Sequence, residues 1–237
     1  MKKILLALLM ATGFGVAQAD VTGNAGVSSD FRFRGVSQSQ NSVAEAVGFD
    51  YTNANGFYAG NLNSSVSSQQ YTHGAGVKSD VYAGFKKGIT EDLKFDIGSY
   101  NHFFARATNG TSNDFNTNEG YAGLAYGPMS VKYNRSLSNY FGAANSKGSH
   151  YYEADLNYPV TGSKVSVLAH AGRLDVRNST ADYNNYNVGL GYNLVGWNLT
   201  AKYYTNSGMT AATKTANTVD GQNLYKNTAV VAVSKAF

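Results

Sequence analysis

Two histidines, His102 and His170, are the residues best suited to chemistry in this chain, because each falls on the polar face of an alternating segment. A hydrolase would need one of them to face the other or a serine in the folded protein. However, the sequence contains no HExxH, no GxSxG and no pair of histidines at metal-ligand spacing. We therefore expect wall or loop positions for the histidines, no catalytic residue, no metal and no cofactor.

Charged side chains that alternate with apolar ones form the largest candidate site. A dry interior could not hold so many charges without pairing each of them, whereas a water-filled interior could. We therefore predict a polar lumen in which these groups form either a narrow conduit or a paired plug. The predicted lumen-lining residues are Asp30, Arg32, Arg34, Asp50, Lys78, Asp80, Lys86, Lys94, Asp96, Glu119, Lys132, Glu153, Asp155, Lys164, His170 and Lys202.

Strands must position these side chains, since successive residues of a strand point to opposite faces. Residues 21–35 show the alternation most clearly, with an apolar or small face and a polar face that becomes charged toward its end. We expect a single strand here, the first of a closed sheet. Its predicted lipid-facing residues are Val27, Phe31 and Phe33, and its predicted lumen-facing residues are Asp30, Arg32 and Arg34.

About twelve alternating segments follow one another, joined by links that are short and long in turn. This layout is typical of antiparallel membrane strands with short periplasmic turns and longer outer loops. An even number of passes returns the chain to its starting side, so residues 225–237 can pair with the first strand and leave no free edge. The sequence therefore predicts an all-β, transmembrane, antiparallel up-and-down β-barrel of about 12 strands.

Composition separates this barrel from a soluble β-sandwich or a lipocalin-like barrel, the main alternatives. The chain has 26 glycines, 18 tyrosines and no cysteine, whereas leucine and isoleucine, which would fill a dry core, are sparse. Aromatic residues gather beside the short turns, where they could form an interfacial girdle. Examples are Phe49, Tyr51, Tyr126, Tyr158 and Trp197.

Residues 1–19 have the three parts of a secretory signal peptide: Lys2 and Lys3, an apolar core over residues 4–10, and the small-x-small sequence of residues 17–19. We predict two parts, a signal peptide at residues 1–19 and a barrel domain at residues 20–237. Removing the two lysines lowers the formal net charge from +4 to +2. The remaining chain is nearly balanced, which argues against a nucleic-acid partner.

Several stretches resemble the TorF-type porin family of proteobacterial outer membranes. The most specific is SDFRFRGVSQ at residues 29–38, and looser matches are GFDY at 48–51, DVYAGF at 80–85 and EGYAGL at 119–124. The resemblance implies a pore in the outer membrane of a Gram-negative cell and leaves its solute undefined. The C-terminal Phe237 is of the residue type that such proteins present to the barrel-assembly machinery.

We therefore expect an outer-membrane, porin-like channel for small polar solutes or ions, with lipid, the assembly machinery and these solutes as partners and an undetermined oligomeric state. One alternative is a plugged structural or binding barrel that makes contacts through its long loops, residues 67–76, 105–116, 138–149 and 206–223. A hydrolase that uses His102 or His170 is a weaker alternative. If Arg32 and Arg34 select ions, reversing their charge should favour cations; otherwise they form a structural ion-pair cluster.

Overall fold

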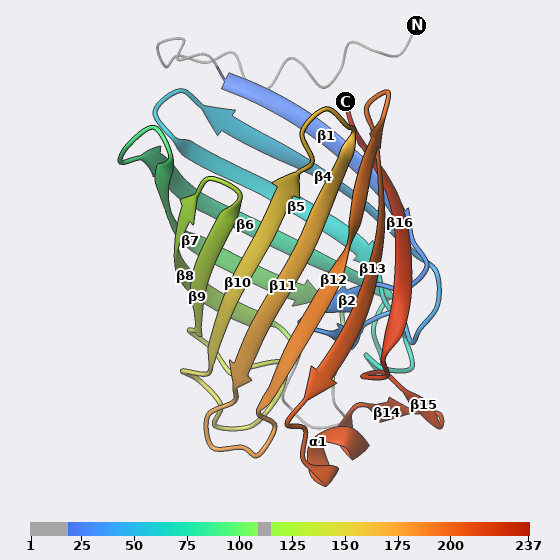
Figure 1. Ribbon diagram of the computed structural model, residues 1–237. Coiled ribbons are helices and arrows are strands. Elements are labelled where there is room, and N and C mark those ends of the chain that lie inside the picture. Colours follow the sequence, from blue (N-terminus) through green and yellow to red (C-terminus); the bar gives the residue numbers. More distant parts are fainter. Residues whose placement is uncertain (1–18, 109–114) are drawn as a thin grey trace, which may run out of the picture.

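Twelve antiparallel strands close into one barrel in the described part of the chain, residues 19–108 and 115–237 of a computed structural model (Figure 1). Each strand pairs with its neighbours in sequence, which is the predicted up-and-down order. The predicted fold class is therefore confirmed. The barrel strands are β1 (Ala19–Ser28), β4 (Ala44–Asn53), β5 (Phe57–Ser65), β6 (Val77–Gly88), β7 (Leu93–Phe104), β8 (Thr117–Tyr126), β9 (Met129–Ser136), β10 (His150–Pro159), β11 (Val165–Asp175), β12 (Tyr183–Leu194), β13 (Trp197–Ser207) and β16 (Thr228–Ala236).

The first and last strands close the barrel. β1 pairs antiparallel with β16, with Val27 opposite Val233 and Asn24 opposite Ala236. The N-terminal end of β1, the C-terminus and the short turns all lie at one end, the short-turn end, and the long links lie at the other, the long-loop end (Figure 1). Pairing on both sides leaves neither terminal strand with an unsatisfied edge.

The outer face of the wall is apolar. Outward-pointing residues such as Val47, Val131 and Val188 are exposed, as are the aromatic residues beside the short turns, including Tyr126 and Trp197. Exposed apolar side chains in a continuous band suit a surface that faces lipid rather than water. No helix in the part of the chain that the structure describes is long and apolar enough to cross a membrane.

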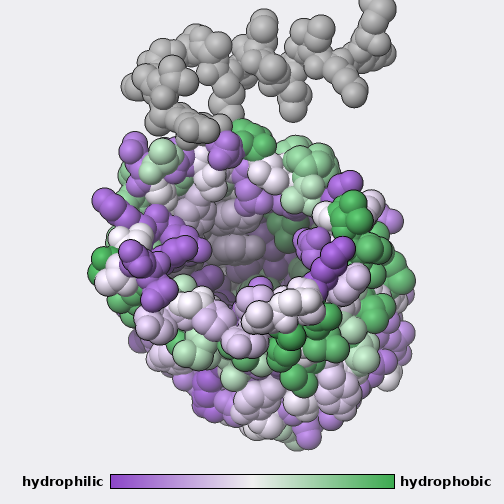
Figure 2. All heavy atoms as spheres, turned by 45° about the horizontal axis from the view of Figure 1, so that its top comes forward, coloured by the Kyte–Doolittle hydropathy of each residue, from purple (hydrophilic) through white to green (hydrophobic). Residues whose placement is uncertain are grey.

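The buried apolar residues lie at the long-loop end, where two clusters form between the loops and the ends of the strands. One contains Val36, Tyr151, Leu174, Val176, Tyr183 and Leu224, and the other contains Val66, Tyr71, Phe104 and Ala107. The last long loop adds a short helix and a small hairpin, α1 (Ala211–Ala216), β14 (Thr218–Val219) and β15 (Gln222–Asn223). The long-loop end is therefore packed, whereas the short-turn end is hollow (Figure 2).

The prediction of one strand over residues 21–35 is wrong. β1 ends at Ser28, and residues 29–43, here called the inward hairpin, turn into the barrel with two short strands, β2 (Arg32–Phe33) and β3 (Val36–Ser37). Phe31 packs against the second apolar cluster, and Phe33 makes an edge-to-face contact with His102, with ring centroids 5.0 Å apart. Neither phenylalanine faces lipid, because the chain leaves the wall before it reaches them.

Two other predictions concern ends of segments. Lys164 was predicted on a strand, but β11 begins at Val165 and Lys164 is exposed in the turn before it. The predicted signal peptide lies outside the described residues except for Ala19, which begins β1 opposite Asn53.

Candidate functional site

The inward hairpin has a two-residue turn at Arg34 and Gly35, whose φ angles are +50° and +80°. Two central residues with positive φ are typical of the tightest β-hairpin turns. Gly35 is required there for a second reason, since a Cβ would lie 2.6 Å from the Cβ of Asn185 on the wall. Arg34 is not a glycine, so its backbone conformation is unusual and needs support from its side-chain contacts.

Arg34 spans the lumen to reach Glu119 on β8. Its Nη1 and Nη2 atoms donate to the two carboxylate oxygens of Glu119 at 2.9 and 2.6 Å, and both side chains are buried. The guanidinium also lies 4.1 Å from the ring centroid of Tyr151 on β10. Burial lowers the pKa of Arg34, but the charge of Glu119 and a hydrogen bond to Glu119 raise it well above its usual value. A charged group therefore attaches the hairpin to β8 and β10, which lie across the barrel from β1.

A chain of paired charges continues from Glu119 along β7 and β6. His102 Nε2 lies 3.4 Å from Glu119, and His102 Nδ1 lies 2.6 Å from Asp80. Asp80 in turn lies 3.1 Å from the ammonium of Lys78, which sits 4.2 Å from the ring centroid of Phe33. All four side chains are buried. These charges are thus compensated by one another and covered by the hairpin.

The base of the hairpin is fixed by a second ion pair. Arg32 Nε donates to Asp30 at 2.7 Å, and the hydroxyls of Ser37 and Ser39 donate to the same carboxylate. Arg32 also donates to the backbone oxygens of Gly35 and Lys226. The DFRFRG stretch therefore supplies the contacts that fold the hairpin and attach it to the last long loop.

A narrow space of about 220 Å³ remains between the hairpin and the wall of β7–β13. His170 lines it, and its Nδ1 lies 2.8 Å from Asp155 while its Nε2 lies 3.0 Å from both Tyr151 and Asn185. Ligand atoms of Glu153, Asp155 and His170 lie within 4.8 Å of one another, the only such group of three in the described residues. Both ring nitrogens of His170 already have partners, so this group is a hydrogen-bonded part of the wall.

A wider cavity of about 630 Å³ opens at the short-turn end and shares Tyr100 and Lys132 with the narrow space. Figure 2 looks into this end and shows a hollow with a largely hydrophilic rim. Its charged lining residues are Lys86, Lys94, Lys132, Asp50 and Asp96, with Lys87 at the edge. The wide cavity and the narrow space therefore adjoin each other at Tyr100 and Lys132, beside the hairpin.

The acids and the lysines of the wide cavity differ in the partners that their charged groups have. Asp50 accepts hydrogen bonds from Asn24 at 2.9 Å and Tyr82 at 2.5 Å, and Asp96 accepts one from Tyr58 at 2.6 Å. By contrast, the described residues contain no ion pair of Lys86, Lys94 or Lys132. The carboxylates accept hydrogen bonds from neutral donors, and the lysines that line the wide cavity outnumber its acids, so its net charge is positive.

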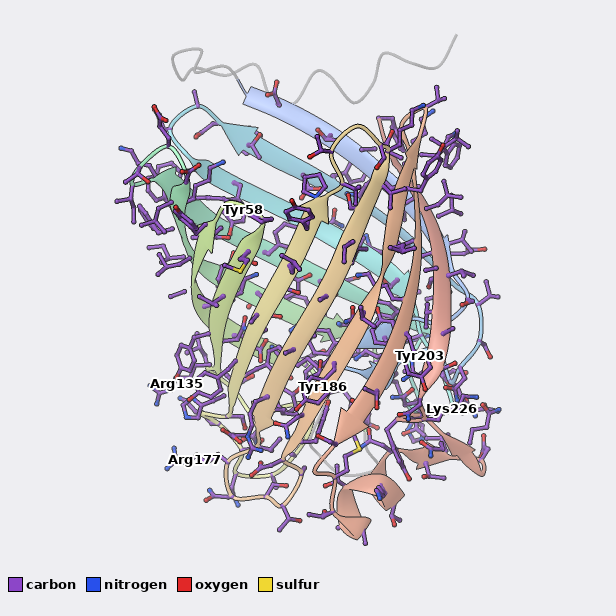
Figure 3. All side chains as sticks on the ribbon, viewed as in Figure 1. Tyr58, Arg135, Arg177, Tyr186, Tyr203 and Lys226 are labelled. Atoms are coloured by element: carbon purple, nitrogen blue, oxygen red, sulfur yellow. The ribbon has the colours of Figure 1, made fainter. Side chains whose placement is uncertain are left out.

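Sequence reasoning missed the tyrosines that build this half. Tyr58 and Tyr121 share a hydrogen bond through their hydroxyls, and the rings of Tyr82 and Tyr100 stack at 5.3 Å. A tyrosine with a glycine two residues away on the same face was the available signal, because a ring can lie over a glycine of the adjacent strand. Figure 3 labels Tyr58 on the cavity wall; its ring lies over Gly84.

Most of the predicted lumen residues lie in the hairpin and the buried charges beneath it, in the narrow space, or in the wide cavity. The exceptions are Lys202, which lies half-buried on β13 over Gly189, and Lys164 in the exposed turn. Arg32 and Arg34 belong to the inward hairpin rather than to a strand of the barrel. Phe237, the predicted assembly signal, is exposed, and its backbone exchanges two hydrogen bonds with Gly23 of β1.

Two solved porin structures share this fold. The NanC porin matches with a TM-score of 0.59 and 11% identity, over 92% of this chain and 99% of that one. The KdgM porin in complex with disordered oligogalacturonate matches with a TM-score of 0.56 and 12% identity, also over 92% and 99%. LpxR from Salmonella typhimurium matches with a TM-score of only 0.42 and 9% identity, over 91% and 99%. The chain thus has a barrel fold that resembles the folds of the NanC and KdgM porins.

No curated protein sequence matches this chain significantly. A protein family described as "Bacterial protein of unknown function (Gcw_chp)" matches residues 14–237. Since the match covers nearly the whole sequence, the chain belongs to the Gcw_chp family.

Proposed function

We propose that this protein is a narrow outer-membrane channel for small polar solutes and ions, with the inward hairpin as its constriction. The observation that carries the proposal is a pair of adjoining cavities lined by charged residues, the wide cavity and the narrow space beside the hairpin, which share Tyr100 and Lys132. A twelve-stranded barrel lies between filled small barrels and open porins, so one loop inside it is enough to set the bore.

The lumen favours anions in this proposal. Lys86, Lys94 and Lys132 raise the local concentration of negative solutes, because the lysines that line the wide cavity outnumber its acids. Arg32 and Arg34 contribute little to selectivity, since Asp30 and Glu119 neutralise them. The oligogalacturonate bound by KdgM is an acidic sugar chain, and small acidic sugars are accordingly among the solutes to test.

The remaining sequence predictions belong to this proposal. Export through a signal peptide at residues 1–19, a barrel domain at residues 20–237, and assembly through Phe237 stay predictions from the sequence pattern. The closer resemblance to the TorF-type porins stays a prediction. With the short turns on the periplasmic side, the long loops face outward.

Single-channel recording tests the proposal. The refolded full chain, verified by heat-modifiable migration on a denaturing gel, should give discrete current steps in a planar bilayer. In a KCl gradient, its reversal potential should indicate chloride preference. A folded barrel that inserts but gives no steps contradicts the proposal.

A closed barrel is the second candidate, and one observation favours it: the ion pair between Arg34 and Glu119 holds the hairpin across the lumen. In that case the long loops would carry the function as a binding surface. Silent bilayers with the intact chain, and current only after the hairpin is released, would identify this candidate. A hydrolase is less well supported, because in the described residues the hydrogen bonds of His102 and His170 go to acids, Tyr151 and Asn185 rather than to serine.

A further inference from the structure

Three basic residues converge on the outer surface at the long-loop end, away from the lumen. A groove of about 660 Å³ lies between the end of β9, the loop that follows β9 and the loop that follows β11, and its lining contains Arg135, Lys147 and Arg177 but no acidic residue. Both guanidinium groups approach the site of a side chain on Gly148, with Arg177 Nη1 at 3.3 Å and Arg135 Nη2 at 3.8 Å from an ideal Cβ. Two like charges therefore share one small space.

These cations have no acidic partner among the ion pairs of the described residues. The nearby carboxylates of Asp175 and Asp182 lie 2.7 and 3.9 Å from Arg173 instead. The side chain of Arg177 donates one hydrogen bond, from Nη1 to the backbone oxygen of Lys147 at 3.4 Å. Converging arginines without a counter-charge suit a ligand with several anionic oxygens, which phosphate provides.

An apolar groove lies on the same strands, directly toward the middle of the barrel wall. It has a volume of about 760 Å³ and is lined by exposed side chains that include Leu124, Val131, Tyr152 and Tyr186. Tyr133 stands between the two grooves, two residues before Arg135 on the outer face of β9. Its ring lies 5.2 Å from that of Tyr152, and its hydroxyl lies 2.7 Å from His150 Nδ1.

The basic groove, the aromatic residues and the apolar groove follow one another along the wall in the same order as the head group, the interfacial region and the acyl chains of a lipid. His150 is opposite Arg135 in the pairing of β10 with β9, so the aromatic cluster ends where the basic groove begins. Aromatic rings with polar tips suit the interface between head groups and acyl chains. Figure 3 shows Arg135 and Arg177 together at one corner of the long-loop end, and Lys226 on the opposite side of the barrel.

We infer that this corner binds a membrane lipid of the outer leaflet, with a phosphate of its head group between Arg135, Lys147 and Arg177 and its acyl chains along the apolar groove. The inference rests on the proposed membrane placement, in which the long loops face outward. It is independent of conduction, because both grooves lie on the outside of the barrel.

Lipid binding by the full chain in detergent micelles tests this inference. The probes are lipid A with its two phosphates, the same lipid with the phosphates removed, and inorganic phosphate, with affinities measured by thermophoresis. The wild-type chain should prefer the phosphorylated lipid by about tenfold or more, since charge-assisted contacts to phosphate are among the stronger hydrogen bonds. Inorganic phosphate should bind far more weakly, because it lacks the acyl chains.

The double variant Arg135→Gln/Arg177→Gln should lose this preference. The double variant Lys214→Gln/Lys226→Gln removes the same charge from exposed lysines of the last long loop and should keep it. Arg135→Lys/Arg177→Lys retains the charge and should bind between the two. Heat-modifiable migration of each variant verifies that its barrel has folded.

Three results would overturn the inference: equal affinity of the wild-type chain for both lipids, an unchanged preference in the folded glutamine variant, or inorganic phosphate binding as tightly as the lipid. The last result would assign the groove to free phosphate. A chain that binds the lipid but passes no current would instead contradict the proposed channel alone.

Discussion

The two halves of the barrel interior hold charge in opposite ways. In the long-loop half, Arg34, Glu119, His102, Asp80 and Lys78 form a buried chain of pairs beneath apolar loops. In the short-turn half, Lys86, Lys94 and Lys132 face a wet cavity whose carboxylates are capped by neutral donors. The same residue types therefore stabilise the fold at one end and remain free to attract solutes at the other.

The largest effect should come from breaking the pair that crosses the lumen. Arg34→Ala leaves Glu119 buried without its partner, and the free energy of unfolding should fall by about 3–5 kcal/mol. Lys86→Ala, which removes an exposed lysine of the other half, should change it by less than about 0.5 kcal/mol. Urea unfolding in lipid vesicles measures both. Equal losses for the two variants would mean that the halves do not differ as described.

A smaller loss of stability should come from crowding the tyrosine wall of the short-turn half. A Cβ on Gly84 would lie 2.6 Å from Cζ of Tyr58 and 2.6 Å from the backbone oxygen of Ile97. Gly84→Ala should therefore cost about 1–3 kcal/mol through overpacking. At Gly191, the nearest atom to a Cβ would be 3.6 Å away, so Gly191→Ala is the matched control and should be nearly neutral. If both variants are neutral in the same unfolding assay, the tyrosines can move and the wall is not rigid.

Replacing the three free lysines should change selectivity rather than stability. Two unit charges about 4 Å apart in water interact by about 1 kcal/mol. The triple variant Lys86→Gln/Lys94→Gln/Lys132→Gln should therefore reduce the preference for chloride by roughly fivefold. Reversal potentials in a KCl gradient measure this. Lys235→Gln, which alters an outward lysine over Trp197 at the same end, should leave the potential unchanged. A triple variant with wild-type selectivity would show that these lysines do not face the permeating ions.

The smallest effect should be that of salt. Between 0.1 and 1 M KCl the screening length falls from about 10 Å to about 3 Å, so the chloride preference due to the exposed lysines should decline at least about twofold. The stability lost on Arg34→Ala should stay nearly constant over this range, because that pair is buried. Reversal potentials and unfolding curves at both concentrations provide the comparison. A chloride preference that does not change with the KCl concentration would mean that buried charges produce it.

The barrel could be predicted from the sequence because alternation and link length are local properties of the chain. The inward hairpin could not, since DFRFRG continues the same alternation past Ser28 and nothing in its period marks the point at which β1 ends. What decides it is a set of distant partners: Glu119 and His102 for the tip, and Leu224 behind Val36. The only sign in the sequence of a turn at Arg34-Gly35 was the single glycine.

The charged residues show the same division. Their presence inside the barrel follows from their positions at every second residue of a strand, because such residues share one face of the sheet. Whether each one is paired depends on tyrosines and asparagines of other strands, such as Tyr82 for Asp50, and these contacts follow from the register rather than from the composition. The sequence accordingly could not distinguish a conduit from a paired plug, and the structure contains a buried, paired cluster in the long-loop half and an open cavity in the short-turn half.

The single-channel conductance of the intact chain beside that of Arg34→Ala is the most direct test of the hairpin as a constriction. The account predicts small, chloride-preferring steps for the intact chain and larger steps for the variant, because the hairpin loses its attachment to β8. Equal conductance for the two folded proteins would contradict it.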